Sequence, residues 1–241
     1  MAIKYINIDL IQKKRIIGTC EFVSIVQQND FDKIEIKNLN LNEEIEINHK
    51  VNISILILIN KVYLTVFDIQ ILEFLQKKNQ EFTYKVKYFS NKLSSFNQVC
   101  LRIFNEWQNE IQNSWEGFES VREKYAWIKC CNILNGVSTS IDLKNNYIIN
   151  GNNIKHPVDL HCLFGELFMG KRGYMGKDYN SFIDCLTQVG LDGSSNKHSS
   201  KITILNYEKL DKTISKFKNH SGYIDAIINE FKISGFHIIK R

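Results

Sequence analysis

The sequence contains few of the features that mark secreted, disulfide-stabilised or membrane-spanning proteins. Proline occurs once, at Pro157, and the six cysteines form no CxxC pair and no spacing typical of a disulfide framework. The longest apolar run, residues 53–59, includes Ser54 and is too short to cross a bilayer. The chain begins Met-Ala-Ile-Lys without the apolar segment of a signal peptide. We therefore expect a cytoplasmic protein with reduced cysteines and no membrane association.

Motifs for catalysis and metal binding are missing as well. The patterns H-E-x-x-H and G-x-S-x-G do not occur, and no Cys/His spacing is typical of a metal site. The glycine-rich segment 170–177 lacks the spacing of a phosphate-binding loop, and Asp178 stands where that loop requires a hydroxyl. His156 and His161 are interpreted as structural or solvent-exposed residues. The sequence predicts no enzyme activity, no catalytic residues, no cofactor and no metal.

A strong charge of one sign is also absent. The net charge is +5 over 241 residues, and most of the excess lies in residues 146–241 without forming a polybasic arm. Hydrophobic residues make up 44% of the chain and aromatic residues 12%, which is enough for a sizeable core. Most aromatic residues fall on apolar stripes, so burial explains them better than stacking on nucleic acid. Nucleic-acid binding is therefore the least favoured of the function classes considered.

The first part of the chain is rich in strand patterns. Apolar and polar residues alternate in Lys33–Leu41 and in Glu44–Ile47, and β-branched residues dominate Val51–Ile59 and Lys61–Leu72. The connections are short and contain Asn, Asp and Lys. Residues 1–92 therefore predict an antiparallel sheet or a small sandwich.

The periodicity changes to that of a helix after Ser94. Apolar residues recur at helical spacing from Val99 to Ile133, as one long helix or as two helices separated near Gly117. The uncharged, turn-rich segment 135–140 then breaks the pattern. We predict a β-rich domain over residues 1–135 closed by the long helix, a linker over 136–145 and a second domain over 146–241.

The second domain alternates strands with pairs of helices. Strands separated by helices imply a parallel sheet, so the pattern predicts an α/β domain. The expected strands are Tyr147–Asn150, Lys201–Asn206 and Phe236–Ile239, and the expected helices include Asp159–Phe168, Glu208–Phe217 and Gly222–Lys232, with a long loop at Gly190–Ser200.

Another helix of this domain follows a glycine-containing turn at residues 173–178. Asp178 is a suitable N-cap, since its carboxylate can accept the free N–H groups of the first turn. The positions i, i+3, i+4 and i+7 are apolar and should face a core, whereas the other side is polar. A solvated helix face is the simplest interpretation of that polar side when the helix is considered alone. The apolar positions are Tyr179, Phe182, Ile183 and Leu186, and the polar ones are Asn180, Asp184 and Gln188.

The order of these elements, together with one motif, resembles the barstar family of small α/β ribonuclease inhibitors. The motif is Tyr174-x-Gly176-x-Asp178-Tyr179-Asn180-Ser181-Phe182-x-Asp184-Cys185-Leu186, and the resemblance covers roughly residues 146–241. It implies a three-stranded parallel sheet with its helices. It also implies a protein that fills the active site of a nuclease with a rigid helix bearing carboxylates and amides, which take the place of phosphates.

The resemblance further implies which residues bind the partner. Asp184 matches the central inhibitory aspartate, Tyr174 a tyrosine that covers the nuclease site and Gly176 a glycine of close approach. The remaining partner-binding candidates are Asp178, in place of an asparagine, Asn180, in place of an acidic residue, Ser181 beside them, Glu230 in the last helix and Ile227 one turn earlier. From spacing alone, an ordinary exposed helical carboxylate is the better interpretation of Glu230.

Several departures from the family pattern bear on the identity of the target. Asn180 removes a charge from the inhibitory helix, while Ile183 and Val189 replace aromatic residues. These departures indicate a target other than a strongly basic, barnase-like enzyme. The resemblance as a whole still implies an immunity protein that occludes a cognate nuclease toxin, in the first place a ribonuclease. The alternative is an interaction module that keeps the barstar fold and binds a partner other than a nuclease.

Overall fold

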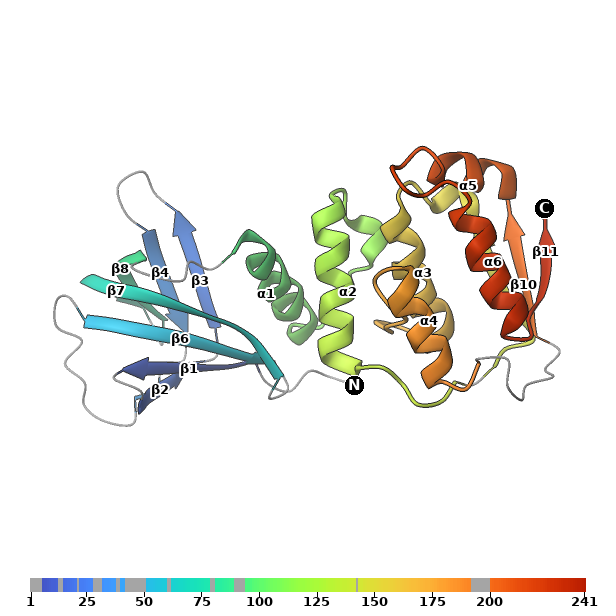
Figure 1. The fold of residues 1–241 in the computed structure, drawn as a ribbon. Coiled ribbons are helices and arrows are strands. Elements are labelled where there is room, and N and C mark those ends of the chain that lie inside the picture. The colour runs from blue at the N-terminus through green and yellow to red at the C-terminus, as the bar shows by residue number, and fades with distance from the viewer. Residues whose placement is uncertain are drawn as a thin grey trace. The chain divides into compact units, whose positions relative to one another are not determined.

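The computed structural model describes residues 6–12, 15–20, 22–27, 32–37, 40–41, 51–59, 62–78, 81–88, 94–141, 143–191 and 200–241. The chain divides into two compact units, Met1–Gln112 and Asn113–Arg241 (Figure 1). The predicted strand Glu44–Ile47 and most of the predicted loop Gly190–Ser200 lie outside the described residues. In the part of the chain that is described, no helix is both long and apolar enough to span a membrane.

The first unit contains an antiparallel sheet in which the strands follow the order β3-β4-β8-β7-β6-β1-β2-β5. Every described strand pairs with its neighbours in the antiparallel sense, so these strands form one continuous hydrogen-bonded sheet. The strands are β1 (Ile6–Gln12), β2 (Arg15–Cys20), β3 (Phe22–Gln27), β4 (Asp32–Lys37), β5 (Asn40–Leu41), β6 (Val51–Ile59), β7 (Val62–Lys78) and β8 (Glu81–Tyr88).

Strand β6 shows why these residues form a sheet with one covered face. Ile53, Ile55, Ile57 and Ile59 are fully buried, whereas the residues between them are partly exposed. This alternation is the period of two that a strand imposes on its side chains. Its partner β7 is long, and the β7–β8 pairing shifts register twice along its length. Such irregularities increase the local twist of the strand.

Of the two predictions for the segment after Ser94, two helices separated near Gly117 is the one that the structure shows, and the two helices belong to different compact units. Helix α1 (Ser95–Gln108) begins at the N-cap Ser94 and ends in the first unit. Helix α2 (Val121–Asn135) begins at a capping box made by Ser120 and Glu123 and lies in the second unit. In the sequence, the short helix η1 (Trp115–Gly117) comes after α1 and before α2. The boundary between the compact units, after Gln112, therefore precedes the linker expected at 136–145.

The second unit is a mixed α/β structure with a three-stranded parallel sheet, as the alternation of strands and helices predicted. Strand β10 lies between β11 and β9, and both pairings are parallel. Figure 1 shows α6 beside β10 and β11, with α3 and α4 beyond it. The remaining elements are β9 (Asn146–Asn150), η2 (Gly151–Asn153), α3 (Pro157–Met169), α4 (Tyr179–Gln188), β10 (Lys201–Leu205), α5 (Tyr207–Ile214), α6 (Tyr223–Ile233) and β11 (His237–Lys240).

A cluster of aromatic side chains fills the core between the sheet and helices α3, α4 and α6. Phe164 of α3 packs on Phe182 of α4 with ring centroids 4.9 Å apart, and on Phe231 of α6 at 5.6 Å. Tyr147 of β9 contacts Phe168 at 4.8 Å. These rings are almost completely buried, and burying a large apolar side chain stabilises the fold by about 1.5–3 kcal/mol. The cluster therefore holds α4 firmly against α3 and α6.

Helix α2 is joined to α3 by a buried ion pair. The Lys124 ammonium donates to Asp159 Oδ1 at 2.7 Å, and neither residue is appreciably exposed. Asp159 Oδ2 accepts the N–H groups of Lys155 and His156 at 2.8 and 3.0 Å, which caps the start of α3. The carboxylate is thus committed to both helices, and this contact explains why α2 belongs to the second unit.

Candidate functional site

The turn before α4 is shaped by a glycine and a capping box. Gly176 has φ +86°, a backbone conformation that side chains disfavour, and an added Cβ would lie 2.4 Å from the Phe182 nitrogen. Asp178 Oδ1 accepts the Ser181 N–H at 2.9 Å, which confirms Asp178 as the N-cap. The Ser181 hydroxyl oxygen accepts the N–H groups of Lys177 and Asp178 at 2.8 and 3.0 Å. Gly176 and Ser181 therefore build the turn itself.

These hydrogen bonds also determine the charge of the turn. Burial opposes ionisation of Asp178, but the hydrogen bonds that its carboxylate accepts from Ser181 outweigh this effect and lower its pKa below the usual value. The nearby charge of Lys177 acts in the same direction. Asp178 is exposed, so the start of α4 presents a carboxylate to solvent.

Helix α4 separates a buried face from an exposed one, as its sequence pattern predicts. Phe182 and Leu186 are buried, whereas Asn180 and Asp184, one turn apart, are exposed. Ile183 is partly exposed beside them. An amide and a carboxylate on consecutive turns can both accept hydrogen bonds from cationic side chains.

Glu230 of α6 is linked to this helix through Tyr179. The Tyr179 hydroxyl donates to Glu230 Oε1 at 2.8 Å, and both residues are partly buried. Burial raises the pKa of Tyr179, and the Glu230 carboxylate raises it further. We call the exposed residues Asp178, Asn180 and Asp184, together with Glu230, the α4–α6 face.

Behind this face lies a pair formed by His161 of α3 and Tyr223 of α6. The His161 Nε2 and the Tyr223 hydroxyl are 2.7 Å apart, and the Tyr223 ring also packs on Tyr179 with centroids 6.1 Å apart. Burial lowers the pKa of His161 to about 4, although the charge of Asp178 opposes this shift. His161 is therefore a neutral core residue at neutral pH, in agreement with its interpretation as structural.

Three predicted partner-binding residues are buried: Gly176 in the turn, Ile227 and Tyr174. Ile227 of α6 is only 3% exposed, so it belongs to the core and its side chain is not available to a partner. Its place one turn before Glu230 predicted a shared face, but the helix turns Ile227 inward and leaves Glu230 partly exposed. Tyr174 is 9% exposed and is also buried.

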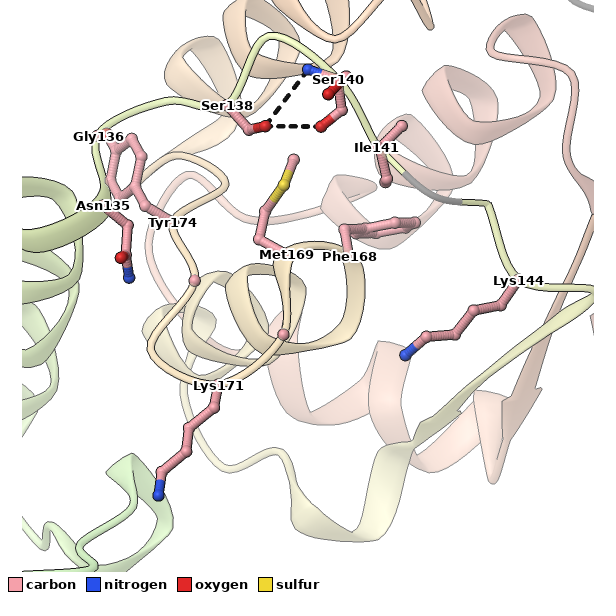
Figure 2. A pocket seen from close by; sticks show the side chains of 12 residues that line it. Asn135, Gly136, Ser138, Ser140, Ile141, Lys144, Phe168, Met169, Lys171 and Tyr174 are labelled. Atoms are coloured by element: carbon pink, nitrogen blue, oxygen red, sulfur yellow. Dashed lines mark hydrogen bonds between the residues drawn. The ribbon is translucent and has the colours of Figure 1, made fainter. Parts of the chain in front are cut away.

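Tyr174 lines a cavity of about 480 Å³ at the carboxyl end of α3 (Figure 2). The cavity lies between this helix end and the segment that the sequence predicts as a linker. Figure 2 shows Met169 beneath Ser138, whose hydroxyl bonds to the backbone of Ser140. The Tyr174 side chain thus lines a cavity, whereas the resemblance implies a tyrosine that covers the site of the nuclease. The lining residues are Asn135, Gly136, Ser138, Ser140, Ile141, Lys144, Phe168, Met169, Gly170, Lys171, Gly173 and Tyr174.

The sequence interpretation missed the roles of two tyrosines. The sequence pattern puts Tyr179 on the apolar stripe of α4, and that stripe does not indicate that the Tyr179 hydroxyl reaches Glu230. Tyr223 is the first residue of α6, and no sequence pattern indicates its contact with His161. Within the described ranges, no group of three or more His, Cys, Asp or Glu side chains is arranged to hold a metal ion.

The chain matches no family model, no curated protein and no solved structure. The resemblance to the barstar family therefore depends on the motif and on the order of the elements.

Proposed function

We propose that the protein is a cytoplasmic immunity protein that inhibits a nuclease, in the first place a ribonuclease, by covering its active site with the α4–α6 face. The proposal assigns direct contacts to Asp178, Asn180, Asp184 and Glu230. Gly176 and Ser181 shape the turn that presents them. No chemical step is required of the inhibitor, because occlusion alone stops the enzyme.

The observation that carries the proposal is a set of carboxylates on two neighbouring helices, exposed on α4 and partly exposed on α6. Asp178 and Asp184 are exposed on α4, and Tyr179 holds Glu230 of α6 beside it. A nuclease site must bind an anionic backbone and is therefore lined with cationic side chains. Carboxylates that pair with guanidinium or ammonium groups form charge-assisted hydrogen bonds. Complementary charge also speeds association and disfavours other partners.

The architecture of the second unit supports the proposal. Its parallel sheet has β10 in the middle, and two helices follow each of β9 and β10. This is the arrangement that the resemblance to the barstar family implies. The aromatic core packs α4 on α3 and α6, so the carboxylates are displayed on elements that are already in place. Such preorganisation reduces the entropy lost on binding.

A partner other than a nuclease is the second candidate, and the charge near the face favours it. Asn180 contributes an uncharged amide, and the exposed Lys177 lies next to Asp178. A face with fewer negative charges suits a less cationic partner. The interaction module proposed as the alternative would use the same residues.

Inhibition of a basic bacterial ribonuclease of the barnase type tests the proposal. The expected result is stoichiometric inhibition, with binding that weakens as salt screens the charges. Binding without inhibition would favour the interaction module. Salt-dependent binding of the isolated protein to RNA would instead contradict both candidates.

A further inference from the structure

We propose that Tyr179 is a positioning residue that determines binding strength by holding the Glu230 carboxylate toward the partner. This inference rests on the proposed function, since it concerns the same α4–α6 face. It assigns a role to a residue that the motif treats only as part of an apolar stripe.

The geometry places Tyr179 between the two helices that form the face. Its ring packs against Tyr223 at the start of α6, with centroids 6.1 Å apart and an interplanar angle of 61°. Its hydroxyl reaches Glu230 Oε1, 2.8 Å away and two turns further along α6. One side chain of α4 therefore contacts α6 at two points, and the second point is a carboxylate of the binding face.

The ring that supports Tyr179 is itself anchored in the core. The Tyr223 hydroxyl lies 2.7 Å from the His161 Nε2, and His161 is 3% exposed. The Tyr223 ring also contacts His220 at 4.9 Å between centroids. These contacts limit the movement of Tyr223, so Tyr179 donates from a supported position.

Holding Glu230 matters because a free glutamate side chain has many rotamers. Ordering such a side chain on binding costs free energy, and the Tyr179 hydrogen bond supplies that order in advance. The hydrogen bond occupies one lone pair of Oε1, and the remaining acceptor sites stay available to a cation of the partner. Loss of the hydroxyl alone should therefore weaken binding and leave the fold intact.

The first test measures the dissociation constant of Tyr179→Phe for a basic bacterial ribonuclease of the barnase type. We expect binding about tenfold weaker, with an unchanged melting temperature. Tyr179→Phe should have no further effect when Glu230→Ala is already present, because the hydroxyl then has no carboxylate to hold. An equal loss in both backgrounds would show that Tyr179 acts on the fold or touches the partner itself, and would overturn the inference.

Tyr207→Phe is the matched control. The Tyr207 hydroxyl donates to Asp225 Oδ1 of α6 at 2.7 Å, so the same type of bond is removed from the same helix but outside the binding face. We expect this variant to bind as tightly as the unmodified chain. A tenfold loss in Tyr207→Phe would mean that any tyrosine bond to α6 has the same effect, which contradicts a specific role for Tyr179.

A second test needs no partner and separates this inference from the proposed function. The carboxyl carbon of Glu230, followed by NMR in the free protein, should change its chemical shift in Tyr179→Phe and keep it in Tyr207→Phe. An unchanged Glu230 signal in Tyr179→Phe would overturn the inference. If the ribonuclease fails to bind the unmodified chain, the proposed target is wrong, and the NMR result alone decides whether Tyr179 positions Glu230.

Discussion

The Lys124 ammonium and the Asp159 carboxylate lie 2.7 Å apart where α2 meets α3, and both are buried. A buried ion pair of this kind adds little net stability compared with apolar residues, but removing one partner leaves an uncompensated charge. The pair therefore makes α2 necessary to the second unit.

The first prediction follows from this pair. Lys124→Ala should destabilise the second unit by about 3–5 kcal/mol, because Asp159 then stays buried without its cation. Thermal unfolding and amide hydrogen exchange of α3 in the full chain would measure the loss. Lys129→Ala is the control, since Lys129 is exposed on the same helix. Equal effects of the two changes would show that the pair is unimportant.

The second prediction concerns which fragment folds alone. We expect residues 113–241 to unfold cooperatively in urea. Residues 146–241, the predicted domain, should be markedly less stable, because they lack α2 and the buried contacts of Trp127 and Lys124. Denaturation curves of the two fragments under identical conditions provide the measurement. Equal midpoints would place the domain boundary at the predicted linker after all.

The third prediction tests the central carboxylate of the α4–α6 face. Asp184→Ala should change the free energy of unfolding by no more than about 0.5 kcal/mol, because the side chain is exposed. It should weaken ribonuclease binding by about 2–5 kcal/mol, since cations of the enzyme would be left unpaired. Glu208→Ala removes an exposed carboxylate from α5 and is the control. This variant should keep both its stability and its affinity for the ribonuclease. Tight binding by Asp184→Ala would remove the main support for the proposed function.

The fourth prediction is a pH dependence caused by His161. Its pKa is about 4 in the folded state, against an ordinary value of 6.5. As the pH falls below 6.5 the unfolded chain takes up the proton first, so stability should fall by about 3 kcal/mol between pH 6.5 and pH 4. Above pH 6.5 this contribution should be constant.

Urea denaturation at several pH values would show the effect of His161. The slope of the unfolding free energy against pH reports how many protons the chain takes up on unfolding. Between pH 6.5 and pH 4, His161→Gln should lower this number by about one, whatever its effect on stability at neutral pH. His237→Gln serves as the control, since His237 is exposed on β11. An unchanged slope in His161→Gln would mean that other groups cause the acid sensitivity.

Local sequence patterns predicted the strands and helices of the second unit, even where an element is covered on both faces, as at the consecutive buried residues Ile202, Thr203 and Ile204 of β10. The predicted strand at Lys201–Asn206 appears as β10 (Lys201–Leu205), and the capping role of Asp178 is confirmed. Periodicity shows which face of a helix is buried, but it does not show which other element that face packs against. Lys124 occupies an ordinary helical position, and only the fold brings it to Asp159. The sequence predicted α2 in the first domain, whereas the compact unit that contains α2 is the second.

The candidate face was predicted in part for a similar reason. The exposure of Asn180 and Asp184 follows from the polar side of α4. The burial of Ile227 and the contact of Tyr179 with Glu230 depend on how α6 is rotated against α4. That rotation is set by the aromatic core, whose members come from distant parts of the chain.

The position of β10 in the middle of the parallel sheet has a consequence for synthesis. Strands β9 and β11 both pair with β10, and the Arg241 N–H still donates to the Ile204 carbonyl at 2.9 Å. A nascent chain therefore completes this sheet only after it has been translated past β11, although α4 is synthesised much earlier. Contacts between such distant segments also form slowly. Under the proposed function, a chain whose synthesis has stopped before β11 would carry the α4 residues of the binding face without a completed sheet.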